Sequence, residues 1–528
     1  MMKYGYILLA AGLLAGCSET AVSSVSPETG EKSENSPTVT TVSDTTYFSD
    51  RDLIQGYDES ETIRITGSQN GIQSDGDVDV TDRLITITEA GVYVLTGTFD
   101  EVQIKVEADD TDKVQIVLEN ATITNSTSAC IYVDRADKLF VTFIGESSLT
   151  HGGAYETQDD VNVNGVIFSR CDLTLNGTGT VYIEDDNGNG VVSRDDLAIT
   201  GGSYTVNVSG HGFRGQEHIA ISDGVFDITC GKDGFHSEND EDENEGILYV
   251  KNGTFTVNAQ DDGFSCSGTA TFVSGAYDIV TGGGSSAAVM QTETMPGRFG
   301  FSTTVEDESE TGMKGIKSDG SLLIQGGTYT FDTQDDAIHC NADITIENGQ
   351  FTIRSGDDGI HSETTVTLKD GTYTISYCYE GIEGNIVTVD GGVYDITAND
   401  DGINATNGTS NMVGVSDGSS VITVNGGTIT VVSDGDSLDS NGDIVVNGGT
   451  LNLTCNGNGN TAIDTDGTFT NQGGDITTND GSENGSGGFG GMKGGVGGQR
   501  PGMQQGQTPP SNRGQQDPSA EGGYGQSA

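Results

Sequence analysis

The chain repeats itself about every 22 residues over positions 328–404, and this repeat limits the folds that are open to it. In each of four successive copies, an alternating run such as 350–353 is followed by a short motif such as Asp-Asp-Gly-Ile at 357–360. The isoleucine of the motif advances by 22, 22 and 21 residues, through Ile338, Ile360, Ile382 and Ile403. A fixed period of this length is typical of solenoids, in which each copy stacks on the one before it.

One copy of the repeat, which we call a rung, consists of short alternating runs joined by glycine turns. Thr, Val, Ile and Tyr alternate with polar residues in these runs, which indicates β-strands. Asn-Gly, Asp-Gly and Gly-Gly pairs supply the positive φ angles that sharp corners need. A rung of 22 residues has no room for a helix that crosses over a sheet. The pattern therefore predicts an all-β parallel β-helix, in which each strand pairs with its copy one rung later.

The repeat extends beyond residues 328–404 in both directions. A glycine followed by an apolar residue recurs from Gly165-Val166 to Gly315-Ile316, and a degraded form recurs at Ser437-Leu438 and Ala462-Ile463. A corner glycine also recurs, with an apolar residue two positions later. Because neighbouring strands lie about 4.8 Å apart, these apolar residues are predicted to stack into a buried ladder. Its members are Tyr204, Phe226, Phe255, Tyr277, Tyr329, Phe351, Tyr373, Tyr394, Ile429, Leu451 and Ile476.

The first 17 residues have the pattern of a lipoprotein signal peptide. Lys3 is their only charge, and the apolar run that follows is too short to cross a membrane as a mature helix. The run ends in Leu-Ala-Gly-Cys, which looks like a bacterial lipobox, so we expect cleavage before Cys17 and lipidation of Cys17. The alternative is an ordinary signal peptide with an incidental cysteine. Residues 18–45 are rich in Ser, Thr and Glu and are expected to form a flexible tether.

The rest of the chain divides by its repeat content. Residues 46–150 alternate like strands without the corner motif, and are expected to form an N-terminal β cap and the first irregular rungs. Residues 151–476 are predicted to be the regular, carbohydrate-binding part of the β-helix. Insertions around 282–313 and 405–420 interrupt the period, and such insertions emerge as loops on one face. Residues 477–528 are rich in Gly, Gln and Pro, and are expected to be a disordered tail.

Composition narrows the possible partners. The formal net charge is −58, from 80 acidic and 22 basic residues, which argues against nucleic acid and is compatible with divalent cations. Trp is absent, so a flat indole platform for sugars is absent as well. None of the eight cysteines is spaced as Cys-x-x-Cys, which argues against a zinc site. Single cysteines scattered through the rungs are expected to be small core residues.

The acidic motif is the feature that carries chemistry. Its carboxylates fall in two positions that recur on successive rungs, about 4.8 Å apart. Two like charges at that distance repel by about 3–4 kcal/mol at an effective dielectric constant near 20, so a column of them favours a bound cation. Carboxylate oxygens in a flexible corner suit Ca²⁺ better than Mg²⁺. The predicted Ca²⁺ ligands are Asp335, Asp336, Asp357, Asp358, Glu380, Asp400 and Asp401, with the equivalent Asp233, Asp261 and Asp262.

Two alternatives to this metal site remain open. The aspartates are also good turn formers, and they could cap hydrogen bonds between rungs with their charges solvated. The acidic run at 238–245 is a second place where a cation could bind, or a solvated loop.

A polar strip is predicted beside the acidic motif. The residue after each apolar step points outward by strand alternation, and on four successive rungs it is Lys317, His339, His361 and Glu383. We expect this strip to bind an anionic polysaccharide through bridging Ca²⁺ and the cationic side chains. The alternative is a solvent-exposed face with no ligand.

These motifs resemble a known family. Residues 314–317 (Lys-Gly-Ile-Lys), 379–384 and 400–405, together with the upstream stretch 85–97, are similar to the bacterial carbohydrate-binding domain-containing β-helix family. That family includes a clostridial surface protein that binds cellulose and pectin-type polysaccharides. The resemblance covers about residues 80–475. It implies a right-handed parallel β-helix, bound Ca²⁺ and carbohydrate binding. It also implies kinship in fold with a pectate lyase family, in which a lysine abstracts a sugar proton and Ca²⁺ neutralises the uronate.

Three functional hypotheses follow. The first is a monomeric, lipid-anchored, Ca²⁺-binding protein of the bacterial cell envelope, facing the surface or the periplasm, that binds polysaccharide without cleaving it. The second is a Ca²⁺-dependent, pectate-type polysaccharide lyase, which needs a lysine base of lowered pKa; Lys314 and Lys317 are the possible bases. The third is a structural adhesin or spacer in which Ca²⁺ only stiffens the rungs.

Overall fold

The computed structural model describes residues 47–484 except 82, 160, 240, 243, 289–311, 409–415 and 417. The described residues form strands and three short 3-10 segments, η2 (Glu59–Glu61), η3 (Ser285–Ala287) and η4 (Ser482–Asn484), with no α-helix among them. None of these described segments is long and apolar enough to cross a membrane as a helix. The fold is therefore all-β, as the alternating sequence predicts.

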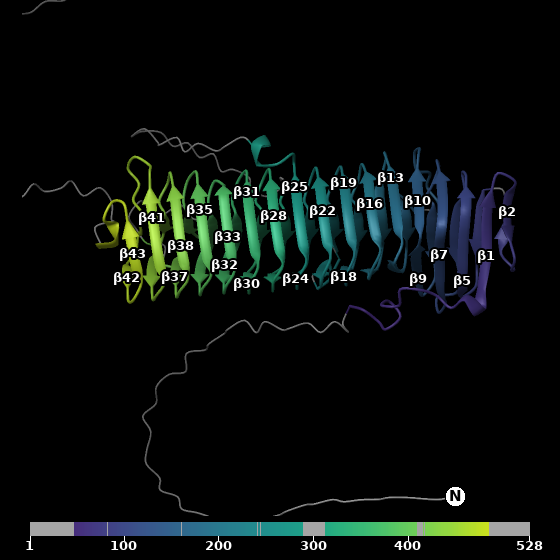
Figure 1. Ribbon diagram of the computed structural model, residues 1–528, viewed down its shortest axis with the longest axis horizontal. Helices are drawn as coiled ribbons and strands as arrows, with labels where there is room; N and C mark the ends of the chain where they lie inside the picture. The colour runs from purple at the N-terminus through teal and green to yellow at the C-terminus, as the bar shows by residue number, and fades with distance from the viewer. Residues whose placement is uncertain are drawn as a thin grey trace, which may run out of the picture. The chain divides into compact units, whose positions relative to one another are not determined.

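The strands pair in parallel from rung to rung and lie side by side along the fold (Figure 1). Over most of the chain, a strand pairs with the third strand before it and the third strand after it. Each rung thus gives one strand to each of three ladders. The repeat sets this register, because Tyr329 pairs with Phe351 and Phe351 pairs with Tyr373.

The first ladder, which we call the aromatic ladder, contains the longest run of paired strands. Its members are β1 (Thr62–Ser68), β5 (Gly91–Phe99), β7 (Lys113–Asn125), β10 (Glu146–His151), β13 (Thr180–Asp185), β16 (Ser203–Val208), β19 (Val225–Cys230), β22 (Thr254–Ala259), β25 (Ala276–Thr281), β28 (Thr328–Thr333), β31 (Gln350–Ser355), β33 (Thr372–Tyr377), β35 (Val393–Ala398), β38 (Thr428–Ser433), β41 (Thr450–Cys455) and β43 (Asp475–Thr478).

The second ladder, the motif ladder, follows the acidic motif. Its members are β4 (Leu84–Ile87), β6 (Gln103–Glu107), β8 (Ile131–Arg135), β11 (Gly165–Ser169), β14 (Asn189–Ser193), β17 (Phe213–Gly215), β20 (Phe235–Ser237), β23 (Phe264–Cys266), β26 (Ile316–Ser318), β29 (Ile338–Cys340), β32 (Ile360–Leu368), β34 (Ile382–Val389), β36 (Ile403–Ala405) and β39 (Leu438–Ser440).

The third ladder closes each rung, and the second halves of β32 and β34 belong to it. Its other members are β9 (Lys138–Ile144), β12 (Asp172–Gly177), β15 (Leu197–Ile199), β18 (His218–Ile221), β21 (Ile247–Val250), β24 (Ala270–Phe272), β27 (Leu322–Ile324), β30 (Ile344–Ile346), β37 (Val421–Val424), β40 (Asp443–Val446) and β42 (Phe469–Asn471).

The predicted buried ladder is confirmed as the centre of the core. From Tyr204 to Tyr394, consecutive rings of the aromatic ladder stack with centroids 4.5–5.1 Å apart and nearly parallel planes. This spacing equals the strand spacing, so the backbone pairing itself sets the ring contacts. Ile429 and Leu451 continue the ladder as buried residues, and Ile476 packs against its end partly buried.

The corner glycines have the positive φ angles that the sequence predicts, apart from Gly474 at the end of the series. Gly349 illustrates why a side chain does not fit there. Its φ is +151°, and a Cβ atom would lie 2.6 Å from Cε2 of Phe351. Phe351 is held between Tyr329 and Tyr373 in the aromatic ladder and has little freedom to move away.

We therefore expect Gly349→Ala to lower the free energy of unfolding by at least about 1–2 kcal/mol, because it adds backbone strain and a clash with a buried ring. Denaturant titration followed by circular dichroism measures the effect. Gly56→Ala is the matched control, because a Cβ atom at Gly56 has no neighbour within 4 Å. Equal stability of the two variants would contradict this account of the corner.

The pairing is less regular before β5. The hairpin of β1 and β2 (Gly71–Ser74) is antiparallel, and so is the pair of β3 (Asp79–Val80) and β4. Further along the chain, register shifts interrupt the pairs β5–β7, β6–β8, β31–β33 and β32–β34. The two predicted insertions, the signal peptide, the tether and the tail lie largely or wholly outside the described residues.

Seven cysteines lie among the described residues, and all of them are free thiols. Five are buried, and Cys171 and Cys455 are partly buried. Burial raises the pKa of Cys266 and Cys340 to about 12. The expectation that the cysteines serve as small core residues is therefore confirmed for most of them.

Candidate functional site

Two columns of polar side chains follow the motif ladder from rung to rung. The first column is the residue before each motif glycine or its replacement, namely Asn189, His211, Asp233, Asp262, Lys314, Asp336, Asp358, Glu380, Asp401 and Asp436. The second column is the second residue of each strand, which follows the apolar residue of the motif. Its members pair in register and are Arg214, His236, Ser265, Lys317, His339, His361, Glu383, Asn404 and Asp439. We call the two columns together the polar ridge.

Carboxylates of the first column cap the backbone of the next rung. Oδ1 of Asp336 accepts a hydrogen bond from the N–H of Asp358 at 2.9 Å, and Oδ1 of Asp358 accepts one from the N–H of Glu380 at 2.9 Å. Asp233 caps Asp262 in the same way. Capping between rungs, one of the alternatives raised by the sequence, thus accounts for one oxygen of each of these aspartates. The second oxygen is left for other partners, which differ along the ridge.

In the N-terminal part of the ridge, basic groups compensate the buried carboxylates. Oδ2 of Asp336 lies 2.8 Å from Nδ1 of His339, 3.5 Å from Nζ of Lys314 and 3.7 Å from Nδ1 of His361. Burial alone would raise the pKa of Asp336, but Lys314 and the two imidazoles outweigh it and hold that pKa well below its usual range. Burial lowers the pKa of His361, but the neighbouring carboxylates of Asp336 and Glu383 outweigh burial and raise that pKa to about 10.

Lys314 is buried and fully engaged in this network. Its ammonium donates a hydrogen bond to Oδ2 of Asp335 at 2.6 Å. Burial lowers its pKa, but the charges of Asp336 and Asp335 outweigh burial and raise the pKa above the ordinary value. A lysine that serves as a general base needs the opposite shift. Lys317, the other possible base, lies in the second column in register with His339 and is half-buried.

In the C-terminal part of the ridge, carboxylates face one another without such compensation. Within the described residues, no ion pair with Lys or Arg is found for Asp358, Glu380 or Asp401. Burial, followed by the charges of Glu383 and other neighbouring carboxylates, raises the pKa values of Asp358 and Glu380 well above their usual range. Burial and the charge of Asp439 do the same for Asp401.

Asn404 adds an unsatisfied oxygen to this part of the ridge. Its Nδ2 donates hydrogen bonds to both carboxylate oxygens of Glu380, at 3.1 and 2.9 Å. Its Oδ1 is buried and has no hydrogen-bond partner. On the two rungs before Asn404, ligand atoms of Asp358, His361 and Glu383 also lie within 4.8 Å of one another. Carboxylate and amide oxygens are the ligands that Ca²⁺ prefers, so the residues present fit that ion.

The residues predicted from sequence come together as two columns. Asp233, Asp262, Asp336, Asp358, Glu380 and Asp401 share the first column, and Asp261, Asp335, Asp357 and Asp400 directly precede four of them in the chain. Ligand atoms of Asp233, Asp261 and Asp262 lie within 4.8 Å of one another. The assignment of individual ions to these residues remains a prediction.

The second column is less open than the predicted strip. His339 is buried, and His361 and Glu383 are only partly exposed. The physical reason is that both imidazoles turn toward the first-column carboxylates, with Nδ1 of His361 also 3.5 Å from Oδ2 of Asp358. The strip is therefore a set of partners for the carboxylates as well as a surface.

Sequence reasoning did not single out His211, Asn404, Asp436 and Asp439 as possible ligands. All four occupy a position of one of the two columns, and alignment of the degraded motifs was the signal that could have found them. Cys17 lies outside the described residues, as do two members of the acidic run 238–245.

Comparisons with known proteins find similarity to carbohydrate-binding domain-containing proteins. A family model described as "Carbohydrate-binding domain-containing protein" matches residues 81–359 and 357–487. A relative with the same description, from Acetivibrio thermocellus (strain ATCC 27405), is 43% identical over 189 residues, which are 35% of this chain and 66% of the relative. The match thus spans just under two thirds of the relative's own length.

A solved structure is also similar to the chain. It is described as the structure of the polysaccharide lyase-like protein from C. thermocellum, gadolinium derivative. The similarity has 30% sequence identity and a TM-score of 0.40, and it covers 42% of this chain and 92% of that chain.

Proposed function

The chain belongs to the family of carbohydrate-binding domain-containing proteins, and from this premise we propose that it binds polysaccharide without cleaving it, with Ca²⁺ bound on the polar ridge. The family match over residues 81–359 and 357–487 is the observation that carries the proposal, because it includes the whole polar ridge. Cellulose and acidic, pectin-type polysaccharides are the proposed ligands.

The scaffold in this proposal is a right-handed parallel β-helix. Parallel pairing of every third strand and one aromatic residue per rung support a coil in which three strands make one turn. Such a coil repeats the same surface about every 4.8 Å. A polysaccharide is also a repeating chain, so a repeating ridge can offer it successive equivalent contacts.

We place the Ca²⁺ site in the C-terminal part of the ridge, around Glu380, Glu383, Asn404 and Asp358. Two observations support this choice. The carboxylates there lack the lysine that compensates Asp336, and Asn404 Oδ1 is a buried acceptor without a partner. A divalent cation would offset the mutual repulsion of the carboxylates and would satisfy the amide oxygen.

Calcium also explains how such an acidic surface can bind an acidic glycan. The ridge would repel uronate carboxylates across its C-terminal part. A Ca²⁺ ion held by the protein on one side can accept glycan carboxylate and hydroxyl oxygens on the other, because it takes six to eight oxygen ligands. The partly exposed Lys317, His361 and Glu383 are the proposed glycan contacts beside it, with His339 beneath them.

The state of Lys314 favours binding over cleavage. Its ammonium is held by Asp335 and Asp336, and its pKa is raised. It would therefore keep its proton when a lyase base must lose it.

Attachment to the cell envelope is part of the same proposal. The lipobox-like sequence that ends in Cys17 supports a lipid anchor, with the folded part carried on the tether 18–45 and facing the surface or the periplasm. A single copy of the chain is the proposed binding unit.

The calcium proposal predicts the effect of one isosteric change. We expect Glu380→Gln to weaken Ca²⁺ binding about 10-fold or more in isothermal titration calorimetry of the full chain, because it removes a ligand charge and keeps the shape. Glu347→Gln is the control, since Glu347 forms an exposed pair with Lys369 away from the ridge. Retention on polygalacturonate should fall for the first variant only. Unchanged Ca²⁺ affinity of Glu380→Gln would refute the proposed site.

A further inference from the structure

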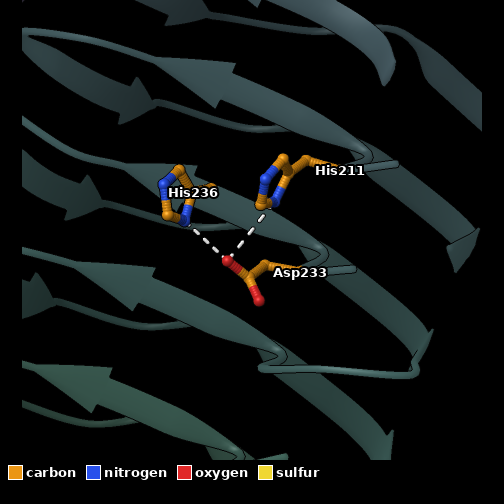
Figure 2. A group of neighbouring side chains, drawn as sticks. All are labelled: His211, Asp233 and His236. Carbon is orange, nitrogen blue, oxygen red and sulfur yellow. Dashed lines mark hydrogen bonds and ion pairs between the residues drawn. The ribbon is translucent and has the colours of Figure 1, made fainter. Parts of the chain in front are cut away.

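One group on the polar ridge has a different ligand chemistry from the rest. His211, Asp233 and His236 come from two adjacent rungs and converge on one point (Figure 2). Nδ1 of His236 lies 2.6 Å and Nδ1 of His211 lies 3.3 Å from Oδ2 of Asp233. The two imidazole rings stack with centroids 4.3 Å apart. Both rings turn Nδ1 toward the same carboxylate oxygen.

His211 supplies an independent observation that points to a ligand at this group. It is 7% exposed, and its buried Nδ1 makes no hydrogen bond, although Oδ2 of Asp233 lies 3.3 Å away as an ion-pair contact. A buried ring nitrogen that makes no hydrogen bond is unfavourable, because it has lost its water without gaining a partner. A metal ion bound at Nδ1 would remove that deficit.

The other two side chains are held in the orientation that a metal requires. Oδ1 of Asp233 accepts the N–H of Asp262 at 2.9 Å, which leaves Oδ2 facing the histidines. Nε2 of His236 lies 2.8 Å from Oε2 of Glu238, which is the outer carboxylate that metal-bound histidines commonly have. Arg214, 3.4 Å from the same Glu238 oxygen, fixes that carboxylate in turn.

We propose that His211, Asp233 and His236 form a binding site for a divalent transition metal of the Zn²⁺ type, distinct from the Ca²⁺ site of the C-terminal part of the ridge. Two nitrogen donors and one carboxylate oxygen suit Zn²⁺, whereas Ca²⁺ takes six to eight oxygens. Three protein ligands leave the fourth position of a tetrahedral ion for water or an external ligand.

The distances require little rearrangement. Ligand atoms at about 2.0–2.1 Å from a tetrahedral Zn²⁺ are about 3.3 Å apart, which equals the separation of His211 Nδ1 and Asp233 Oδ2. The 2.6 Å contact of His236 opens by about 0.7 Å when Zn²⁺ takes the place of the Nδ1 proton. Without metal, burial lowers the pKa of His236, and its bonds to Asp233 and Glu238 outweigh this and raise the pKa to about 9.

The similar group around Asp336 already contains a lysine. Asp336, His339 and His361 also bring ligand atoms within 4.8 Å of one another. There, however, Nζ of Lys314 lies 3.5 Å from Oδ2 of Asp336 and already supplies the cation. The spacing of the cysteines bears only on thiolate zinc sites and does not exclude a site made of histidines and a carboxylate.

The test is a competition titration of Zn²⁺ between the full chain and a chromophoric chelator, with excess Ca²⁺ present to fill oxygen sites. We expect one tight equivalent of Zn²⁺ that is weakened at least about 100-fold in His211→Asn and in His236→Gln, and about 10–100-fold in Glu238→Gln. His218→Gln is the control, because His218 pairs with Asp196 outside the group. Unchanged Zn²⁺ binding in both histidine variants would overturn the proposal, and so would displacement of this equivalent by Ca²⁺.

A second measurement keeps the test decisive if a variant fails to fold. Crystals of the unsubstituted chain soaked in Zn²⁺ should give an anomalous scattering peak at the zinc edge between His211, Asp233 and His236. A peak elsewhere, or no peak at this group, would overturn the proposal. Neither experiment depends on glycan binding, so the zinc site and the proposed function can fail separately.

Discussion

The metal-free chain is expected to be less stable at pH 8 than at pH 5, and Ca²⁺ is expected to reverse this order. The physical reason is the set of buried carboxylates around Glu380, which repel one another once they are ionised. At 100 times its dissociation constant, an ion that binds only the folded state adds about 2.7 kcal/mol to the free energy of unfolding. Thermal melting in chelator and in Ca²⁺ at the two pH values measures both effects.

The lower stability expected at pH 8 follows from the shifted pKa values. Asp358, Glu380 and Asp401 have pKa values raised by burial and by neighbouring carboxylates, and Asp436 and Asp439 are raised to about 7 in the same way. Between the unfolded and folded pKa values, the folded state holds more protons than the unfolded state. These groups therefore contribute stability at low pH that is lost as the pH rises through their folded pKa values.

His211 opposes this trend, because burial lowers its pKa and its contribution is lost as the pH falls below 6.5, but it is one group against several raised carboxylates and two raised imidazoles. His236 and His361 have pKa values raised to about 9 and 10, so their contribution is complete below 6.5 and also falls as the pH rises. Asp336 has a lowered pKa, and its contribution is lost only as the pH falls below 3.8, outside the range compared. Because Ca²⁺ competes with protons for the carboxylates, its effect should be larger at pH 8 than at pH 5. Equal stabilisation by Ca²⁺ at both pH values would contradict the assignment.

Lys314→Met is expected to lower the free energy of unfolding by about 3–5 kcal/mol, because it leaves buried carboxylates without their cation. The ammonium lies 2.6 Å from Asp335 Oδ2 and 3.5 Å from Asp336 Oδ2, and the side chain is buried. Methionine keeps much of the volume and removes the charge together with the hydrogen bond to Asp335. Chemical denaturation of the full chain measures the loss.

A matched variant separates the buried charge from a general effect of losing a lysine. Lys369 forms an exposed pair with Glu347, so Lys369→Met should change stability by less than about 1 kcal/mol. The Lys314 variant should also recover part of its stability in Ca²⁺, because the freed carboxylates become an oxygen site. A loss no larger than that of the Lys369 variant would show that Lys314 does not compensate the first column.

The repeat made the scaffold predictable from sequence. Each corner glycine is followed two positions later by a core residue, as at Gly349 and Phe351. Because this pair recurs with the repeat, many positions indicate the same strand register. The parallel pairing and the buried aromatic ladder were both expected on this basis. The antiparallel hairpin of β1 and β2 was not, because residues 62–74 lack the repeated motif.

The site was predictable in its columns but not in its partners. The motif spacing aligns Asp336, Asp358 and Glu380, yet it does not reveal that each aspartate uses one oxygen to cap the next rung. Nor does it show that Lys314 donates a hydrogen bond to Asp335, or that the amide of Asn404 donates to Glu380. These contacts depend on side-chain rotamers in three dimensions, which alternation along one strand does not specify.

Retention of the full chain on polygalacturonate, with insoluble cellulose in parallel, decides whether this protein binds polysaccharide through Ca²⁺. The binding would be compared in Ca²⁺ and in chelator while the supernatant is followed for the absorbance of unsaturated uronates. The account predicts retention on polygalacturonate that needs Ca²⁺, with no unsaturated product. Product release would contradict it by showing a lyase, and absence of retention on both polymers would contradict polysaccharide binding itself.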